Sequence, residues 1–254
     1  MGKTISISNH KGGVGKTTST INIGAALHQL GKKVLLVDLD PQANLSQSLG
    51  IIDVEHDIYE SLSKKSKLKP YSYKEGFDLI PSCLNLSGAE IELSSSIGRE
   101  YILKKLIDEI KDNYDYILID CPPSLGLLAI NAFAAADEIL IPAQAEFLST
   151  QGLTKLIEVI GEIRCDLNKN LKVAGIIITQ YDSRKNLNKE VVDFIDSEFK
   201  NEVFNTKIRN NIALAEAPAM SMDIFSYNPK SNGTSDYMEL TKEILKREET
   251  SKIL

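Results

Sequence analysis

Residues 10–18 read H-K-G-G-V-G-K-T-T, and this motif is the strongest indication of fold class in the chain. From Gly15 onward it matches the phosphate-binding loop G-x-x-x-x-G-K-[ST]. It departs from that pattern at two positions: His10 replaces the first glycine, and Lys11 adds a second cation. A strand-like run precedes the loop and a helical pattern follows it, which is the strand–loop–helix context that the motif requires.

The residue types of the loop suit phosphate binding. Gly12, Gly13 and Gly15 let the backbone turn sharply and direct its N–H groups at phosphate oxygens. The amino end of the following helix adds a partial positive charge. Lys16 is placed to reach the β- and γ-phosphates, and the Thr17 hydroxyl is placed to bind Mg²⁺. The loop therefore predicts a nucleoside triphosphate site with Lys16 as its main cation.

Short apolar runs alternate along the chain with longer helical patterns. The expected strands are 4–8, 34–38, 116–120, 138–142 and 173–179, and the expected helices are 16–30, 99–112, 126–136, 150–164, 188–199 and 235–247. Runs that are apolar on both faces suit parallel strands covered by helices, joined by right-handed crossovers. We therefore expect an α/β fold with a mainly parallel twisted sheet flanked by helices, in a single domain over residues 1–254.

Two stretches interrupt this alternation. Residues 52–98 include five lysines between Lys64 and Lys74, and we expect this stretch to be a solvated excursion at the rim of the fold. Residues 205–234 are rich in Asn, Pro and Ser, and we expect a surface loop near the carboxyl edge of the sheet.

Acidic residues follow two of the expected strands. Asp38 and Asp40 lie in V-D-L-D-P-Q, and Asp120 closes the run Y-I-L-I-D. Nucleotides bind at the carboxyl edge of such sheets, so these acids are expected near the phosphate loop. Because Mg²⁺ prefers carboxylate and water ligands, we predict a metal site from Thr17, Asp38 and Asp120, with Asp120 acting through water. Asp40 is predicted to position the attacking water. The alternative is that these acids only cap loops.

Composition limits the classes of protein that this chain can represent. Lysine and arginine total 29 against 35 acids, and a formal net charge of −6 argues against coating nucleic acid by bulk charge. No run of 18 apolar residues occurs and the first residues do not resemble a signal peptide, so we expect a cytoplasmic protein. Cys83, Cys121 and Cys165 are widely spaced, and we interpret them as buried, reduced thiols.

Three segments in order carry a resemblance to a known family: K-G-G-V-G-K-T-T, V-L-L-V-D-L-D-P-Q-A-N and D-Y-I-L-I-D-C-P-P-S-L-G. With Y-D-S-R and A-L-A-E-A-P further along, they closely resemble the ParA family of deviant Walker A ATPases, in its Soj-like partitioning branch. The resemblance covers nearly the whole chain and implies a P-loop NTPase with ATP and Mg²⁺ as cofactors. The nucleotide contacts that it implies in the loop are Lys11, Gly12, Gly13, Val14, Gly15, Lys16, Thr17 and Thr18.

The resemblance also gives the second loop lysine a role. In that family two ATP-bound subunits pack face to face, and each sends this lysine to the nucleotide of the other. Lys11 is therefore expected to act in trans, with Lys16 and Asp40 as the other catalytic residues; the alternative is a lysine that serves its own loop. The family further implies a homodimer that binds DNA without sequence preference, and a ParB-type centromere-binding partner that stimulates hydrolysis. Chromosome or plasmid DNA is segregated in this way, so the expected location is the cytoplasm, in association with the nucleoid.

The chain departs from the family pattern near residue 209. Where the family commonly has I-P-R-N, residues 208–211 read I-R-N-N. Arg209 replaces the proline that lies against adenine, and Asn211 aligns with a nucleotide-contacting asparagine, so both are assigned to the nucleotide by this alignment. The basic side chains assigned to DNA are Lys207, Arg209, Lys230, Lys242, Lys246 and Arg247.

Three other classes of protein are weighed against this interpretation. A MinD-like membrane positioner has a similar core but ends in a basic amphipathic helix, whereas K-R-E-E-T-S-K-I-L contains paired acids, so no stable membrane association is expected. A reductase like the nitrogenase iron protein needs two cysteines per subunit at a dimer interface, and the three cysteines form no obvious pair. A scaffold without turnover is disfavoured by the presence of Asp40 and Asp120.

Overall fold

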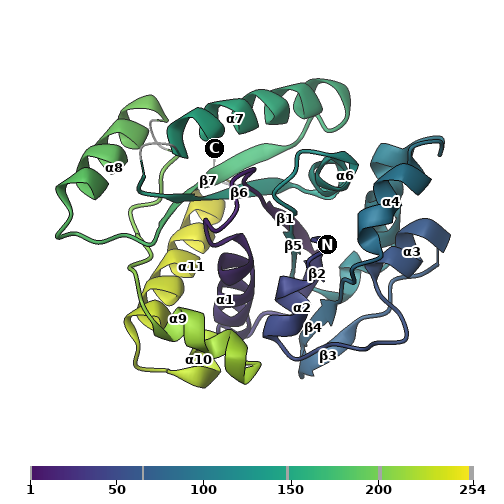
Figure 1. Cartoon of the computed structure of the whole chain (residues 1–254), viewed down its shortest axis with the longest axis horizontal. Helices are drawn as coiled ribbons and strands as arrows, with labels where there is room; N and C mark the ends of the chain where they lie inside the picture. The colour runs from purple at the N-terminus through teal and green to yellow at the C-terminus, as the bar shows by residue number, and fades with distance from the viewer. Residues whose placement is uncertain (1, 65, 147–148, 200–201, 252–254) are drawn as a thin grey trace.

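A computed structural model describes residues 2–64, 66–146, 149–199 and 202–251. Its centre is a seven-stranded sheet in the order β3-β4-β2-β5-β1-β6-β7 (Figure 1). Neighbouring strands pair in parallel, except that β3 and β4 are antiparallel. The strands are β1 (Lys3–Ile7), β2 (Val34–Asp38), β3 (Tyr71–Lys74), β4 (Phe77–Ile80), β5 (Tyr116–Asp120), β6 (Glu138–Gln144) and β7 (Lys172–Thr179). The predicted α/β class with a mainly parallel sheet is confirmed.

Helices cover both faces of the sheet (Figure 1). One face packs against α1 (Lys16–Gln29), α2 (Asn44–Ser48), α9 (Ala213–Glu216), α10 (Ile224–Tyr227) and α11 (Asn232–Ser251). The other face packs against α3 (Ile58–Lys64), α4 (Leu86–Leu93), α5 (Ile102–Asp108), α6 (Leu127–Ala135), α7 (Ser149–Asp166) and α8 (Asn186–Glu198). Short 3-10 turns lie at Arg99–Tyr101, Lys111–Asn113 and Ala217–Met220.

The central strands are buried on both faces, which explains why they are apolar without alternation. Every residue of β2 and β5 is buried. Leu36 and Leu118 point to the face covered by α1 and α11, whereas Leu35 and Ile117 point to the other face. The α1 helix lies close to the sheet at Gly24, where an added Cβ would come within 2.8 Å of the Leu36 side chain.

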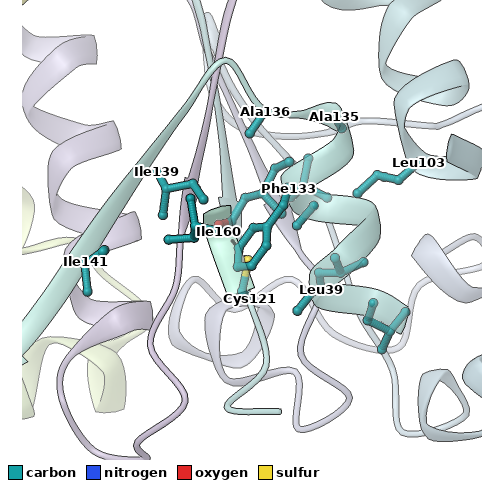
Figure 2. Close-up of a cluster of buried hydrophobic side chains, with 14 of the residues drawn as sticks. Leu39, Leu103, Cys121, Phe133, Ala135, Ala136, Ile139, Ile141 and Ile160 are labelled. Atoms are coloured by element: carbon teal, nitrogen blue, oxygen red, sulfur yellow. Dashed lines mark hydrogen bonds between the residues drawn. The ribbon is translucent and has the colours of Figure 1, made fainter. Parts of the chain in front are cut away.

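Figure 2 shows the core on the second face, where the Phe133 ring of α6 lies beside Cys121. Both side chains are fully buried. Burial raises the pKa of Cys121, so this thiol stays protonated and apolar in character. Cys83 is half-buried and Cys165 is exposed, so the prediction of three buried thiols is wrong for the latter. All three cysteines are free.

The register of the strands brings the acidic positions to one edge of the sheet. Asp120 pairs with Ile7 on one side and with Asp38 on the other. The phosphate loop begins three residues after Ile7, and β1 lies next to β5 in the sheet. The carboxyl ends of three neighbouring strands therefore meet where the loop starts.

The prediction that residues 52–98 form a solvated excursion at the rim holds for β3, an edge strand with partly exposed side chains, but is wrong for the strand and helices around it. The segment also supplies β4, which lies between β2 and β3, and the side chains of Phe77 and Leu79 are fully buried. Tyr73 and Lys74 tie the β3–β4 hairpin to buried Asp223 at the start of α10. A four-residue strand is too short to show its own pattern when a lysine-rich stretch shortly precedes it.

Residues 205–234 contain more regular structure than the predicted loop. They include α9, a 3-10 turn, α10 and the first residues of α11. The segment runs beside the end of β7, where the Tyr181 N–H donates to the Ile208 carbonyl at 3.0 Å. The last helix is also longer than predicted: it begins at Asn232 rather than 235 and runs to Ser251 rather than 247.

The burial of β4 predicts a stability effect. Leu79→Ala removes a side chain that is 0% exposed, so we expect it to lower the free energy of unfolding by about 2–5 kcal/mol. Leu84→Ala is the matched control, because Leu84 is 70% exposed and its change is expected to stay within about 0.5 kcal/mol. Urea unfolding followed by circular dichroism measures both. Equal losses in the two variants would contradict the placement of β4 in the core.

Candidate functional site

The phosphate loop joins the end of β1 to the start of α1. Gly13 and Gly15 have φ angles of +74° and +87°, a backbone region that favours glycine. Among the described residues, no atom beyond the immediate chain neighbours lies within 4 Å of a Cβ placed on Gly12 or Gly13. The crest of the loop is therefore open to a ligand, with the amino end of α1 behind it.

Lys16 is a buried cation under this loop. It is the first residue of α1, is only 7% exposed, and donates from Nζ to the Lys11 carbonyl at 3.2 Å. Burial lowers the pKa of Lys16, and the negative charge of Asp120 opposes that shift. A buried ammonium group needs an anionic partner, and a polyphosphate on the loop would supply one.

Thr17 and Asp120 are joined directly. The Thr17 hydroxyl donates to Asp120 Oδ2 at 2.6 Å, and the Thr20 hydroxyl lies 3.3 Å from Asp120 Oδ1. Burial, with a smaller contribution from the nearby charge of Asp38, raises the pKa of Asp120 to about 8. A cation beside these oxygens would favour the ionised carboxylate.

Asp38 has its own hydrogen-bond partners. Its Oδ2 accepts from the backbone N–H and the hydroxyl of Ser46 at 2.9 and 2.7 Å, and its Oδ1 accepts from the Asp40 N–H at 3.2 Å. Burial raises the pKa of Asp38 to about 6. The carboxylate thus fixes α2 at the edge of the sheet, and its predicted role as a metal ligand stays a prediction.

The donor set fits Mg²⁺, which prefers hard oxygen ligands and retains several waters. The Thr17 hydroxyl and the Asp120 carboxylate present such oxygens side by side at the amino end of α1. If Mg²⁺ binds here, these two residues would hold it, Thr17 directly and Asp120 through water, as the sequence predicts.

Asp40 lies two residues beyond β2 and is 7% exposed. Its Oδ1 accepts from the Gln42 N–H at 2.9 Å, and its carbonyl accepts from the Ser82 hydroxyl at 2.8 Å. Its charge acts on both Lys16 and Asp120, which places the carboxylate in the same electrostatic cluster.

Lys11 is held within its own chain. Its Nζ lies 2.8 Å from Glu146 Oε2 and 3.4 Å from Gln144 Oε1, and its backbone N–H donates to Asn9 Oδ1 at 3.0 Å. The Lys11 side chain is 31% exposed and that of Glu146 is 59% exposed, so the ion pair is solvated and weak. Little free energy is needed to release Lys11 toward another partner.

Polar residues at the carboxyl ends of β6 and β7, which were not predicted from the sequence, donate hydrogen bonds to the loop. The amide groups of Gln144 and Gln180 donate to the Gly13 carbonyl at 3.0 and 2.8 Å. The Thr179 hydroxyl donates to the Val14 carbonyl at 2.8 Å. The available signal was the position of these residues, because each lies at or just after the carboxyl end of β6 or β7.

The two residues assigned to the nucleotide from segment 208–211 make contacts inside the chain. The Arg209 guanidinium pairs with Asp236 at distances down to 2.6 Å, and the Arg209 backbone N–H donates to the same carboxylate. Asn211 Oδ1 accepts from the Ala213 N–H at 2.9 Å at the start of α9. Their nucleotide contacts stay predictions.

Four of the six basic residues assigned to DNA are engaged with neighbours. Besides Arg209, Lys207 lies over the Tyr181 ring at 5.5 Å, Lys242 pairs with Glu239, and Arg247 pairs with Glu243. Lys230 and Lys246 are exposed. Exposed cations reach a phosphate backbone more readily than cations held by buried or half-buried carboxylates, so the structure favours these two within the predicted set, together with Lys242, whose ion pair with Glu239 is solvated and weak.

In the described part of the chain, no helix has the length and apolar character needed to cross a membrane.

Known proteins resemble this chain over nearly its whole length. Residues 2–173 match a protein family described as an AAA domain. The chromosome-partitioning ATPase Soj of Treponema pallidum is 44% identical over 251 residues, which cover 98% of this chain and 99% of that protein. Similarity over nearly the full length of both proteins indicates a shared fold.

Two solved structures resemble the whole fold. Cobyrinic acid a,c-diamide synthase of Mycobacterium smegmatis, solved with ADP and magnesium, has a TM-score of 0.88 at 32% identity and covers 99% of this chain and 97% of its own. The septum site-determining protein MinD of Pyrococcus horikoshii, solved with Mg-ADP, has a TM-score of 0.80 at 28% identity and covers 96% of both chains. The identity and coverage of the relatives confirm the family resemblance: the chain belongs to the ParA/Soj family of chromosome-partitioning ATPases.

Proposed function

We propose that this chain binds ATP with Mg²⁺ and hydrolyses it to ADP and phosphate. The observation that carries the proposal is the buried Lys16 ammonium under an open glycine loop, beside the Thr17–Asp120 hydrogen bond. The loop N–H groups and Lys16 bind the phosphates, while Thr17 and Asp120 hold the metal. Solved neighbours with bound ADP and magnesium support the choice of ligands.

Asp40 positions the attacking water in this proposal. Its carboxylate is buried, its charge acts on that of Lys16, and it is able to accept a hydrogen bond from water near the γ-phosphate. When bound, Mg²⁺ neutralises negative charge on the phosphate oxygens. The chain thereby supplies binding, orientation and one acceptor, which is most of what phosphoryl transfer to water requires.

Lys11 acts across a homodimer in this proposal. The phosphate loop carries two lysines, and Lys16 already occupies the position beneath the loop. Lys11 forms a solvated ion pair with Glu146. A triphosphate bound to a facing subunit would compete with Glu146 for the Lys11 ammonium group. Triphosphate buried between two subunits gains charge-assisted hydrogen bonds as water leaves, which supports a dimer that forms on ATP.

The cellular role that we propose is the segregation of chromosome or plasmid DNA by a single-domain protein over residues 1–254. The ATP dimer binds DNA without sequence preference, and a ParB-type partner stimulates hydrolysis and release. The protein is then cytoplasmic and associated with the nucleoid. Membership of a partitioning family supports this role, as do the exposed lysines Lys230 and Lys246.

A second candidate function is ATP-dependent positioning at a membrane, because a MinD protein shares the fold. The packing of α11 opposes it. Tyr237, Leu240 and Ile244 are buried against the core, so this apolar face of the helix is already occupied within the chain. Partitioning of DNA is therefore the better supported function.

The first test separates the two loop lysines. In Lys11→Ala, Lys16 and the loop N–H groups remain, so we expect monomer affinity for ATP like that of the wild type but no dimer at saturating ATP. Lys16→Ala removes a charge-assisted contact worth about 1.5–3 kcal/mol, so ATP affinity itself is expected to fall about 10- to 150-fold. Titration at low protein concentration and mass measurement by light scattering give the two readouts. Weak monomer binding with normal dimers in Lys11→Ala would refute action in trans.

The second test concerns hydrolysis. Asp40→Ala keeps the backbone contacts to Asp38 and Ser82 and removes only the carboxylate, so the fold and the bound ATP are expected to persist. The ATPase rate should fall by about 100-fold or more, because the attacking water loses its acceptor. Asp193→Ala, an exposed acid on α8, is the control and should keep the wild-type rate. If Asp40→Ala hydrolyses ATP at the wild-type rate, Asp40 only shapes its loop.

The third test concerns DNA. With ATP present, affinity for unrelated duplexes should be similar, and its logarithm should fall linearly with the logarithm of salt concentration. Lys230→Gln should weaken binding to all duplexes alike and reduce the salt slope by about 1 if this lysine neutralises one DNA phosphate. Lys155→Gln, on α7 at the opposite face of the sheet, should change neither quantity. Strong preference for one duplex, or ATP-dependent sedimentation with liposomes instead of DNA binding, would contradict the proposed role.

A further inference from the structure

Two consecutive carbonyl groups at the crest of the phosphate loop are held by side chains from distant parts of the chain. The Gly13 carbonyl accepts from Gln144 Nε2 at 3.0 Å and from Gln180 Nε2 at 2.8 Å. The Val14 carbonyl accepts from the Thr179 hydroxyl at 2.8 Å. These donors come from the ends of β6 and β7, and we call the three side chains the carbonyl clasp.

The contacts of both the oxygen and the nitrogen of the Gln144 amide support the same orientation of the group. Its Oε1 faces the Lys11 ammonium at 3.4 Å, so its Nε2 is the end that faces Gly13. The Gly13 carbonyl therefore receives two N–H donors, which use both of its lone pairs.

Gln180 adopts an unusual backbone conformation to make its contact. Its φ is +51°, in the left-handed region that non-glycine residues seldom occupy. The next residue is fixed by the hydrogen bond from the Tyr181 N–H to the Ile208 carbonyl at 3.0 Å. Such conformations persist when the surrounding structure enforces them, and they cluster at functional sites.

Because the peptide bond is planar, the carbonyl clasp also sets the direction of the next backbone N–H groups. In a trans peptide the N–H of one residue points opposite to the carbonyl of the residue before it. Holding the Gly13 and Val14 carbonyls toward the ends of β6 and β7 therefore directs the Val14 and Gly15 N–H groups the other way. Backbone N–H groups aligned in this manner form an anion site.

We propose that Gln144, Thr179 and Gln180 are positioning residues that hold the phosphate loop in its anion-binding conformation before the nucleotide arrives. This inference rests on the proposed function and adds to it the groups that orient the loop. A glycine-rich loop without these contacts samples other conformations, and binding must then order it at a cost in affinity. The clasp removes that cost from the binding step.

The test compares nucleotide affinity with stability. Gln180→Met keeps length and volume but removes the donor; Gln144→Met/Gln180→Met removes both donors to Gly13. Each net hydrogen bond corresponds to a factor of about 2 to 12 in an equilibrium constant, so Mg-ADP affinity of the double variant should fall about 5- to 150-fold. Titration with Mg-ADP at low protein concentration, where dimers do not form, measures this. Gln29→Met, an exposed residue at the far end of α1, is the control and should bind like the wild type.

Two further measurements separate positioning from general stability. The thermal midpoint without nucleotide should change little, whereas a merely structural role would lower that midpoint and leave the affinity of the folded protein unchanged. Gln180→Asn retains an amide and suits the left-handed backbone, but it is one methylene too short for the contact, so it should bind Mg-ADP as weakly as Gln180→Met. Wild-type affinity in these variants would overturn the clasp while the proposed function stands. A wild-type protein that binds no Mg-ADP would overturn the proposed function and the clasp together.

Discussion

Burial of one ammonium group among three carboxylates is the constraint on which the rest of the site depends. Lys16, Asp38, Asp40 and Asp120 are each at most 7% exposed, and acids outnumber the single cation. Burial and mutual repulsion raise the pKa of Asp120 to about 8. Such a cluster is most stable when it is joined by both a divalent cation and an anion, since the cation balances the acids and the anion balances Lys16. The parallel register of β1, β5 and β2 imposes this crowding, because it brings all three strand ends to one edge.

The phosphate site at this edge of the sheet includes more than the loop and the acids. Contacts from Gln144, Thr179 and Gln180 make the ends of β6 and β7 part of the phosphate site. The β6–α7 connection also carries Glu146, which holds Lys11. The backbone of Tyr181 follows Gln180 directly and pairs with segment 208–211, so the loop is linked to the region assigned to adenine and DNA. A few short polar contacts thus join the loop to this region.

Much of the fold was predictable from local pattern, and the exceptions have a common cause. The strands at 34–38 and 116–120 were predicted at their observed positions because strands buried on both faces are continuously apolar. β4 was missed because a run of only four residues shortly after a lysine-rich stretch resembles a surface segment, although Phe77 and Leu79 are fully buried. Its burial comes from pairing with β2, a contact that no local pattern encodes.

Spacing along one stretch of chain was enough to predict the phosphate loop, the helix behind it and the acids at the strand ends, because that spacing is what creates each feature. Which side chains share the site follows from the fold of the whole chain. The fold brought Asp120 to Thr17, Glu146 to Lys11, and Asp236 to Arg209, over separations of 103, 135 and 27 residues. These pairings follow from the order of strands in the sheet and the packing of helices on it. A hydrogen bond or ion pair needs its two groups within a few ångströms, and only the folded chain sets that distance.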